Sequence, residues 1–157
     1  MIEAGGSYDT VRAAFRWRIP PRYNIAVDVC DRQRADGLAL LVEDESGALS
    51  RYSFGAIRAL SNRCANVLRA HGVSAGDRIG VLLSQGVELP VVHLAAYKLG
   101  AVALPLFALF GPDALAYRLN DSEAKVVVTD RLGAEKIMSV REELHSLAHV
   151  FVVDGAA

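Results

Sequence analysis

Cysteine is scarce in this sequence of 157 residues. The two cysteines, Cys30 and Cys64, do not form a C-x-x-C motif, and they imply no disulfide framework. Proline is also sparse, with 5 residues, and 52% of the residues are hydrophobic, which excludes a disordered or low-complexity chain. We therefore expect a folded protein from a reducing compartment, and the expected location is cytoplasmic.

An excess of one charge is missing as well, since 17 basic and 18 acidic residues leave a formal net charge of −1. The chain therefore has no global positive field to hold nucleic acid or an anionic membrane. The longest apolar stretch, residues 89–110, contains prolines, a glycine and charged residues, so it cannot form one transmembrane helix. Residues 1–22 lack the apolar core of a secretory signal. The sequence predicts no nucleic-acid partner and no membrane span.

Recognisable catalytic motifs are absent too. Neither GxGxxG nor GxxxxGK[ST] occurs, so there is no phosphate-binding glycine loop. The sequence also lacks the GxSxG motif of serine hydrolases. His145 and His149 are four residues apart, but Ser146 stands where a zinc protease needs Glu. The residues by themselves nominate no catalytic group and no metal ligand.

From residue 38 onward, continuous apolar runs alternate with segments of helical periodicity. The pattern predicts strands at 38–42, 49–52, 79–83, 101–105, 125–129 and 150–153, and helices at 54–71, 87–99, from 112 onward and at 133–146. Short connections and strands rich in Val, Leu and Ile are typical of a mostly parallel sheet with helices on both faces. We therefore predict an α/β fold, with residues 1–37 as an N-terminal helical segment and 38–157 as a partial α/β subdomain.

The end of the sequence follows directly on the strand expected at 150–153. A parallel strand is normally followed by a crossover that covers its outer face, and none follows here. We therefore expect the chain to be a fragment of a longer protein. The uncovered strand and unmatched apolar surface also predict self-association of this fragment.

Three stretches resemble a known family when they are read together. They are YSFGAI at 52–57, which continues through SNRCANVL at 61–68 to GDRI at 76–79, then YKLGAVALPL at 97–106, and LFGPDALAYRL at 109–119. In this order and spacing they resemble the opening of the AMP-forming acyl-CoA synthetases, members of the adenylate-forming superfamily. The FGPDAL run and residues 17–26 resemble the acetyl-CoA and medium-chain acyl-CoA synthetase branch. The similarity covers about residues 8–154.

The resemblance implies the first part of that family's large N-terminal domain and a two-step reaction. A short- or medium-chain carboxylate reacts with ATP, assisted by Mg²⁺, to give an acyl-adenylate, and the acyl group then passes to CoA. The family's phosphate loop, its aromatic-Thr-Glu motif, its ribose-binding Asp and its C-terminal domain have no counterpart in this sequence. The resemblance therefore implies that this chain alone is inactive, binds none of these cofactors and needs the remainder of the synthetase chain.

The resemblance also nominates a binding site for the CoA nucleotide. In the acetyl-CoA synthetase branch, the loop that matches Phe107, Ala108 and Leu109 runs beside this nucleotide. A basic residue after the following strand helps to hold the 3′-phosphate, which nominates Arg131 or Lys136. An aromatic face suits adenine and a cation suits phosphate. Ala108 and Leu109 replace glycines of the family, so a loop that only packs on the core, with Lys136 in solvent, stays an open alternative.

Two other functions also stay open at this point. One is a naturally short, non-catalytic scaffold or assembly module derived from this fold, whose exposed sheet edge pairs with another chain. The other is a stand-alone nucleotide-binding α/β protein, which the missing phosphate loop disfavours.

Overall fold

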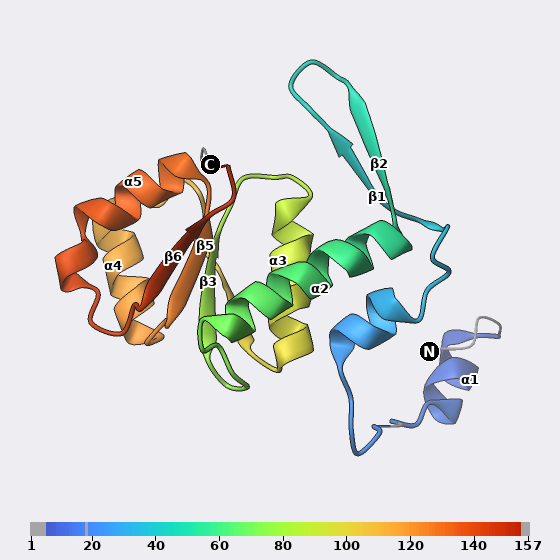
Figure 1. The fold of residues 1–157 in the computed structure, drawn as a ribbon. Coiled ribbons are helices and arrows are strands. Elements are labelled where there is room, and N and C mark those ends of the chain that lie inside the picture. Colours follow the sequence, from blue (N-terminus) through green and yellow to red (C-terminus); the bar gives the residue numbers. More distant parts are fainter. Residues whose placement is uncertain (1–5, 18, 155–157) are drawn as a thin grey trace.

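The computed structural model describes residues 6–17 and 19–154 (Figure 1). Its elements are α1 (Tyr8–Ala14), the π-helical turn η1 (Val27–Asp31), β1 (Leu38–Glu43), β2 (Leu49–Ser53), α2 (Phe54–Ala70), β3 (Arg78–Leu82), α3 (Glu88–Leu99), β4 (Val102–Pro105), α4 (Pro112–Asp121), β5 (Val126–Thr129), α5 (Arg131–Ser139), the 3-10 turn η2 (Arg141–Glu143) and β6 (His149–Val152). Within these described ranges, no helix is long and apolar enough to cross a membrane.

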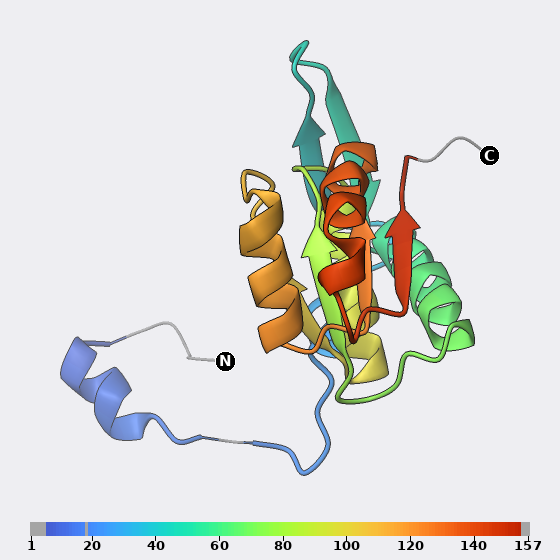
Figure 2. The same ribbon diagram turned by 90° about the vertical axis from the view of Figure 1, so that its left-hand side faces the viewer.

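Strands β3 to β6 form one parallel sheet in the order β4-β3-β5-β6. Ile79 of β3 pairs with Ala103 of β4 on one side and with Val126 of β5 on the other. Helices α2 and α3 cover one face of this sheet, and α4 and α5 cover the opposite face (Figures 1 and 2). Strands buried from both sides are apolar along most of their length, as β5 is, with three valines before Thr129, whose buried hydroxyl donates to the carbonyl of Leu82. The predicted α/β class is confirmed.

Side chains of alternate direction along each strand feed two separate cores. Val126 and Val128 pack in a cluster with Leu68 of α2, on the face that α2 and α3 cover. Val127, between them, packs in a second cluster with Leu115 of α4. Each face of the sheet therefore has its own hydrophobic layer, which fixes the helices on both sides.

Helix α5 starts earlier and ends sooner than the range 133–146 predicted from the periodicity. It begins after Asp130, whose side-chain Oδ1 accepts a hydrogen bond from the Gly133 N–H at 2.8 Å. It ends at Ser139, and a 3-10 turn follows. The guanidinium of Arg141 then donates to two backbone carbonyls further along the chain, which replaces helical hydrogen bonding in this segment.

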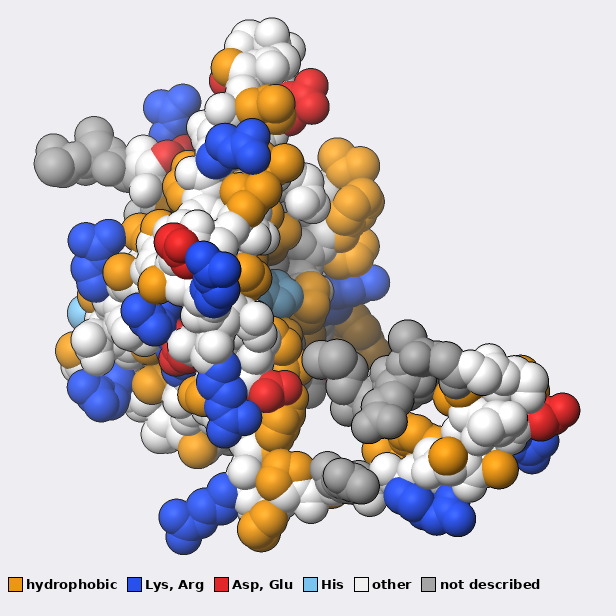
Figure 3. All heavy atoms as spheres, turned by 90° about the vertical axis from the view of Figure 1, so that its right-hand side faces the viewer, with side chains coloured by type: hydrophobic (Ala, Val, Ile, Leu, Met, Phe, Trp, Pro, Cys, Tyr) orange, Lys and Arg blue, Asp and Glu red, His pale blue; other side chains and the backbone are white. Residues whose placement is uncertain are grey.

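The hairpin of β1 and β2 and the N-terminal segment extend away from the layered body (Figures 1 and 2). Helix α1 buries none of its residues. Nearby Trp17 is 81% exposed and touches only the edge of Phe15 among aromatic rings of the described residues. The turn η1 is anchored, because Asp31 pairs with Lys98 of α3 at 2.9 Å. Figure 3 shows hydrophobic side chains gathered on the hairpin and on the N-terminal segment.

Candidate functional site at the carboxyl edge of the sheet

The crossovers that leave the two central strands, β3 and β5, run toward opposite sides of the sheet. After β3 the chain crosses to β4 through α3 on one face, and after β5 it crosses to β6 through α5 on the other face. Such a position is a topological switch point, and in open α/β sheets ligands bind there, outside the carboxyl ends of the strands. The loops that follow β3, β4, β5 and β6 are therefore the first place to look for a site.

A side-chain hydrogen bond joins the segments that follow β3 and β5. The Ser84 hydroxyl, which follows β3, donates to Asp130 Oδ2 at 3.0 Å. The same aspartate caps α5, and Oδ1 of Asp154 accepts the N–H of Arg131 at 2.8 Å. Two carboxylates thus occupy the positive end of the α5 dipole, where an anion would otherwise be attracted. Sequence reasoning missed this cluster, although Ser84, Asp130 and Asp154 each come within two residues of the end of a strand.

The loop predicted to lie beside a nucleotide follows β4 and stands at this same edge. The N–H of Phe110 donates to the carbonyl of Phe107 at 2.9 Å, which closes a turn over residues 107–110. The two rings meet edge to face, with centres 5.8 Å apart. Phe107 is 60% exposed and Leu109 is 79% exposed. The 107–110 turn therefore presents two apolar side chains to solvent.

The structure brings Lys136 to this turn. Its Nζ donates to the carbonyl oxygen of Ala108 at 2.6 Å and to that of Phe110 at 3.3 Å. From α4, the guanidinium carbon of Arg118 lies 4.1 Å from the centre of the Phe110 ring, a cation–π contact. Arg131 lies apart from these groups, at the exposed start of α5. The nominated residues are thus divided: the loop and Lys136 are in contact, whereas the Arg131 side chain has no hydrogen-bond partner in the described residues.

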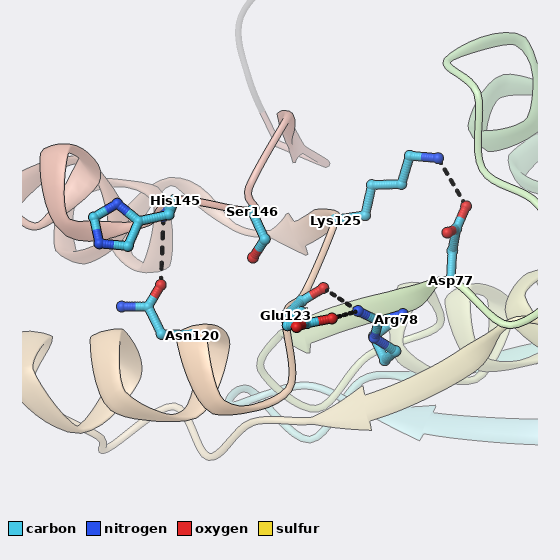
Figure 4. A pocket seen from close by; sticks show the side chains of 7 residues that line it. All are labelled: Asp77, Arg78, Asn120, Glu123, Lys125, His145 and Ser146. Carbon is cyan, nitrogen blue, oxygen red and sulfur yellow. Dashed lines mark hydrogen bonds and ion pairs between the residues drawn. The ribbon is translucent and has the colours of Figure 1, made fainter.

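The opposite edge, at the amino ends of the strands, contains an open hollow of about 450 Å³ (Figure 4). It is lined by Asp77, Arg78, Asn120, Glu123, Lys125, His145 and Ser146. Its charges are paired, because Lys125 lies 2.8 Å from Asp77 and Arg78 lies 2.8 Å from Glu123. The hydrogen bond from Lys125 lowers the pKa of Asp77 to about 2. These groups bind one another and tie loops to the sheet, so we assign the hollow a structural role.

Other groups that could carry chemistry are packed into the core. Burial raises the pKa of the Cys64 thiol to about 11 and also raises that of Cys30, so both stay protonated and unreactive. Burial lowers the pKa of His93, whose ring nitrogen lies 3.4 Å from the Tyr97 hydroxyl. In the part of the chain that the structure describes, no three His, Cys, Asp or Glu side chains gather as metal ligands.

Comparisons with known proteins match most of the chain. The family described as AMP-binding enzyme matches residues 28–157. The acetyl-coenzyme A synthetase of Bacillus subtilis (strain 168) is 40% identical over 141 residues, which are 87% of this chain and 24% of that protein. The crystal structure of Brucella canis acyl-CoA synthetase matches with a TM-score of 0.83 and 30% identity, over 96% of this chain and 29% of that one.

A second solved structure, an anthranilate CoA ligase in complex with anthranoyl-AMP, matches with a TM-score of 0.78 and 30% identity. The match covers 86% of this chain and 26% of the ligase. The chain therefore spans about a quarter of the length of the relatives that it matches.

Proposed function

The chain belongs to the family of AMP-binding enzymes, and from this premise we propose that it is the amino-terminal part of an AMP-forming acyl-CoA synthetase. The observation that carries the proposal is the match to an acyl-CoA synthetase along 96% of the chain at a TM-score of 0.83. The sequence similarity to acetyl-coenzyme A synthetase supports a small carboxylate as the substrate. We do not propose the scaffold role, because each relative described above is a synthetase or ligase.

The whole protein would carry out two displacements. A carboxylate oxygen attacks the α-phosphorus of ATP, the bond to the β-phosphate oxygen breaks, and pyrophosphate leaves. The thiolate sulfur of CoA then attacks the acyl carbon, and AMP leaves with the electron pair of the broken acyl–oxygen bond. We assign neither Mg²⁺ nor the phosphates of ATP to the described residues, which offer no metal-ligand cluster and no phosphate loop.

This chain alone should not form an adenylate. The test is ATP–pyrophosphate exchange by the 157-residue chain with acetate, butyrate and benzoate, beside a full-length acetyl-coenzyme A synthetase as positive control. Exchange no faster than in the absence of protein is expected, and clear turnover with any of the acids would contradict the proposal. Sequencing the coding DNA beyond the Ala157 codon adds a second test. An open frame that reaches a Ser/Thr/Gly-rich loop supports the synthetase, and a stop codon removes catalysis.

Within the whole protein, we propose that the 107–110 turn lies beside the adenine of CoA. The exposed Phe107 ring offers an aromatic face, and the exposed guanidinium of Arg131 is the candidate for the 3′-phosphate. The nearby carboxylates of Asp130 and Asp154 oppose an anion, so this phosphate contact should be weak.

A variant of the whole protein tests the loop. Phe107→Ala should raise the KM for CoA about tenfold, on the scale of stacking one base on an aromatic ring. Tyr117→Ala is the matched control, because Tyr117 is an equally exposed aromatic residue on α4, 69% exposed. An unchanged KM for CoA in the Phe107 variant would leave the ring a packing role only.

We also propose that the isolated chain self-associates weakly through β6. Among the described residues this strand pairs with β5 alone, and Val152 and Val153 at its end are 39% and 43% exposed. Unpaired backbone groups on an edge strand form a template for pairing with another chain. Sedimentation velocity at rising concentration should show a growing dimer fraction, and a clean monomer at the highest concentration would count against this.

A further inference from the structure

The ammonium group of Lys136 lies between α5 and the 107–110 turn. Its side chain is half-buried, and two of its three N–H donors point at the carbonyls of Ala108 and Phe110, at 2.6 and 3.3 Å. Hydrogen bonds from a charged donor are stronger than neutral ones, and the shorter of these two has a charge-assisted length. The sequence nominated Lys136 as a partner for phosphate, but most of its hydrogen-bonding capacity is already directed at the turn.

The 107–110 turn depends on Lys136 because few backbone hydrogen bonds hold the turn. Its start is fixed where the N–H of Leu106 donates to Val81 in the sheet, at 2.9 Å. Between that point and α4, the bond from the Phe110 N–H to Phe107 is the backbone bond within the turn. Arg118 holds the Phe110 ring from α4, and Lys136 holds the carbonyls from α5. Cations on two helices thus fix the turn and leave the Phe107 ring outside.

We propose that Lys136 is a positioning residue for CoA binding: it holds the 107–110 turn in the conformation that presents Phe107 to the adenine. The inference rests on the proposed function. Lys136 acts through the turn and does not ligate the 3′-phosphate. A turn that is ordered before CoA arrives avoids the conformational entropy that a flexible loop would lose on binding.

The first experiment measures the turn itself, in the 157-residue chain. Lys136→Met keeps the aliphatic stem and removes the ammonium, so the Phe110 amide should exchange with solvent about tenfold faster. The Leu106 amide, held by the sheet, should keep its rate. Lys136→Arg should restore protection, and Glu135→Gln, an exposed neighbour on α5, is the control for helix stability. Unchanged exchange at Phe110 in Lys136→Met would overturn the inference.

The second experiment measures CoA use by the whole synthetase. Lys136→Met should raise the KM for CoA about tenfold while ATP–pyrophosphate exchange, which does not involve CoA, keeps its wild-type rate. Lys136→Arg should recover most of the loss. The same factor should appear with 3′-dephospho-CoA, because a positioning residue does not read the phosphate. A factor that disappears with dephospho-CoA would make Lys136 a phosphate ligand and overturn the positioning role.

Two further outcomes separate this inference from the function beneath it. A KM for CoA that stays unchanged, although the Phe110 amide exchanges faster, would overturn the role in CoA binding and leave a structural contact. Absence of pyrophosphate exchange in the wild-type whole protein would overturn the proposed function and the CoA role with it. The exchange rate of the Phe110 amide would be unaffected by that failure, so the two results are distinguishable.

Discussion

The two edges of the parallel sheet use their charged side chains in opposite ways. At the amino edge, the pairs Lys125–Asp77 and Arg78–Glu123 line a hollow and bind each other. At the carboxyl edge, Lys136 is directed at loop carbonyls, and the Phe107 ring is left outside. A hollow rich in charge is thus the poorer guide to function here, because its four charged groups are bonded to one another. The carboxyl edge keeps the exposed Phe107 ring and the Arg131 side chain available for a ligand.

The largest effect should come from the packing beneath the carboxyl edge. A Cβ on Gly133 would collide with Oγ1 of Thr129 and lie 3.0 Å from Cδ2 of Leu82. Gly133→Ala should therefore lower the free energy of unfolding by about 2–3 kcal/mol, measured by urea denaturation. Gly111→Ser is the control, since Gly111 precedes α4 in an extended conformation with open space around it. An equal loss in the control would contradict the packing explanation.

The second-largest effect on stability is expected at the amino edge, where the contribution of the Lys125–Asp77 pair should depend on pH. The hydrogen bond from Lys125 lowers the pKa of Asp77 from its ordinary 3.8 to about 2. A carboxyl whose pKa is lower in the folded state stabilises the protein fully above about pH 4, and this contribution is lost as the pH falls toward 2. Asp77→Asn should cost about 1 kcal/mol at pH 7, after allowance for solvent screening.

Urea denaturation at a series of pH values checks this prediction. The difference in unfolding free energy between wild type and Asp77→Asn should shrink below pH 4 and vanish only below pH 2, where the carboxyl is protonated in the folded state as well. A difference that stays constant across this range would mean that the ion pair does not stabilise the amino edge. The electrostatic difference between the two edges would then be contradicted.

The smallest effect on stability is expected for Phe107, at the carboxyl edge. Phe107→Ala should change the free energy of unfolding by less than about 0.5 kcal/mol, because most of the ring is in solvent. Leu115→Ala, at a position that is 0% exposed, should cost about 2–5 kcal/mol in the same assay. A loss comparable to that of Leu115→Ala would place the Phe107 ring in the core and remove the contrast.

Most of the fold was predictable because local signals agree with the tertiary structure. Gly100 adopts a left-handed conformation, φ +69°, and ends α3 as predicted. The end of α5 was predicted wrongly, because the conformation of the next segment depends on Arg141, whose guanidinium bonds carbonyls further along the chain. The strand order could not be predicted from local sequence patterns either, because β3 pairs with β5, and α3, β4 and α4 lie between these two strands in the sequence.

The candidate site divides in the same way. The resemblance to a family nominated the loop at 107–109, with Arg131 or Lys136 as its basic partner, and the structure places Lys136 in contact with the carbonyl of Ala108. The pair Ser84–Asp130 gave no signal, because its members are 46 residues apart and meet only when β3 and β5 pair. Contacts of this kind are set by topology, and a single sequence carries no direct record of them.

The central position of β3 also has a consequence for the growing chain on the ribosome. Its partner β4 follows after one helix, but the strand on its other side, β5, emerges only after α4 has been made. Until then, one flank of β3 has no strand partner, although Leu82 and Leu106 are already present for α4 to pack on. We expect a nascent chain paused within α4 to need a chaperone, and one released after β6 to need it less.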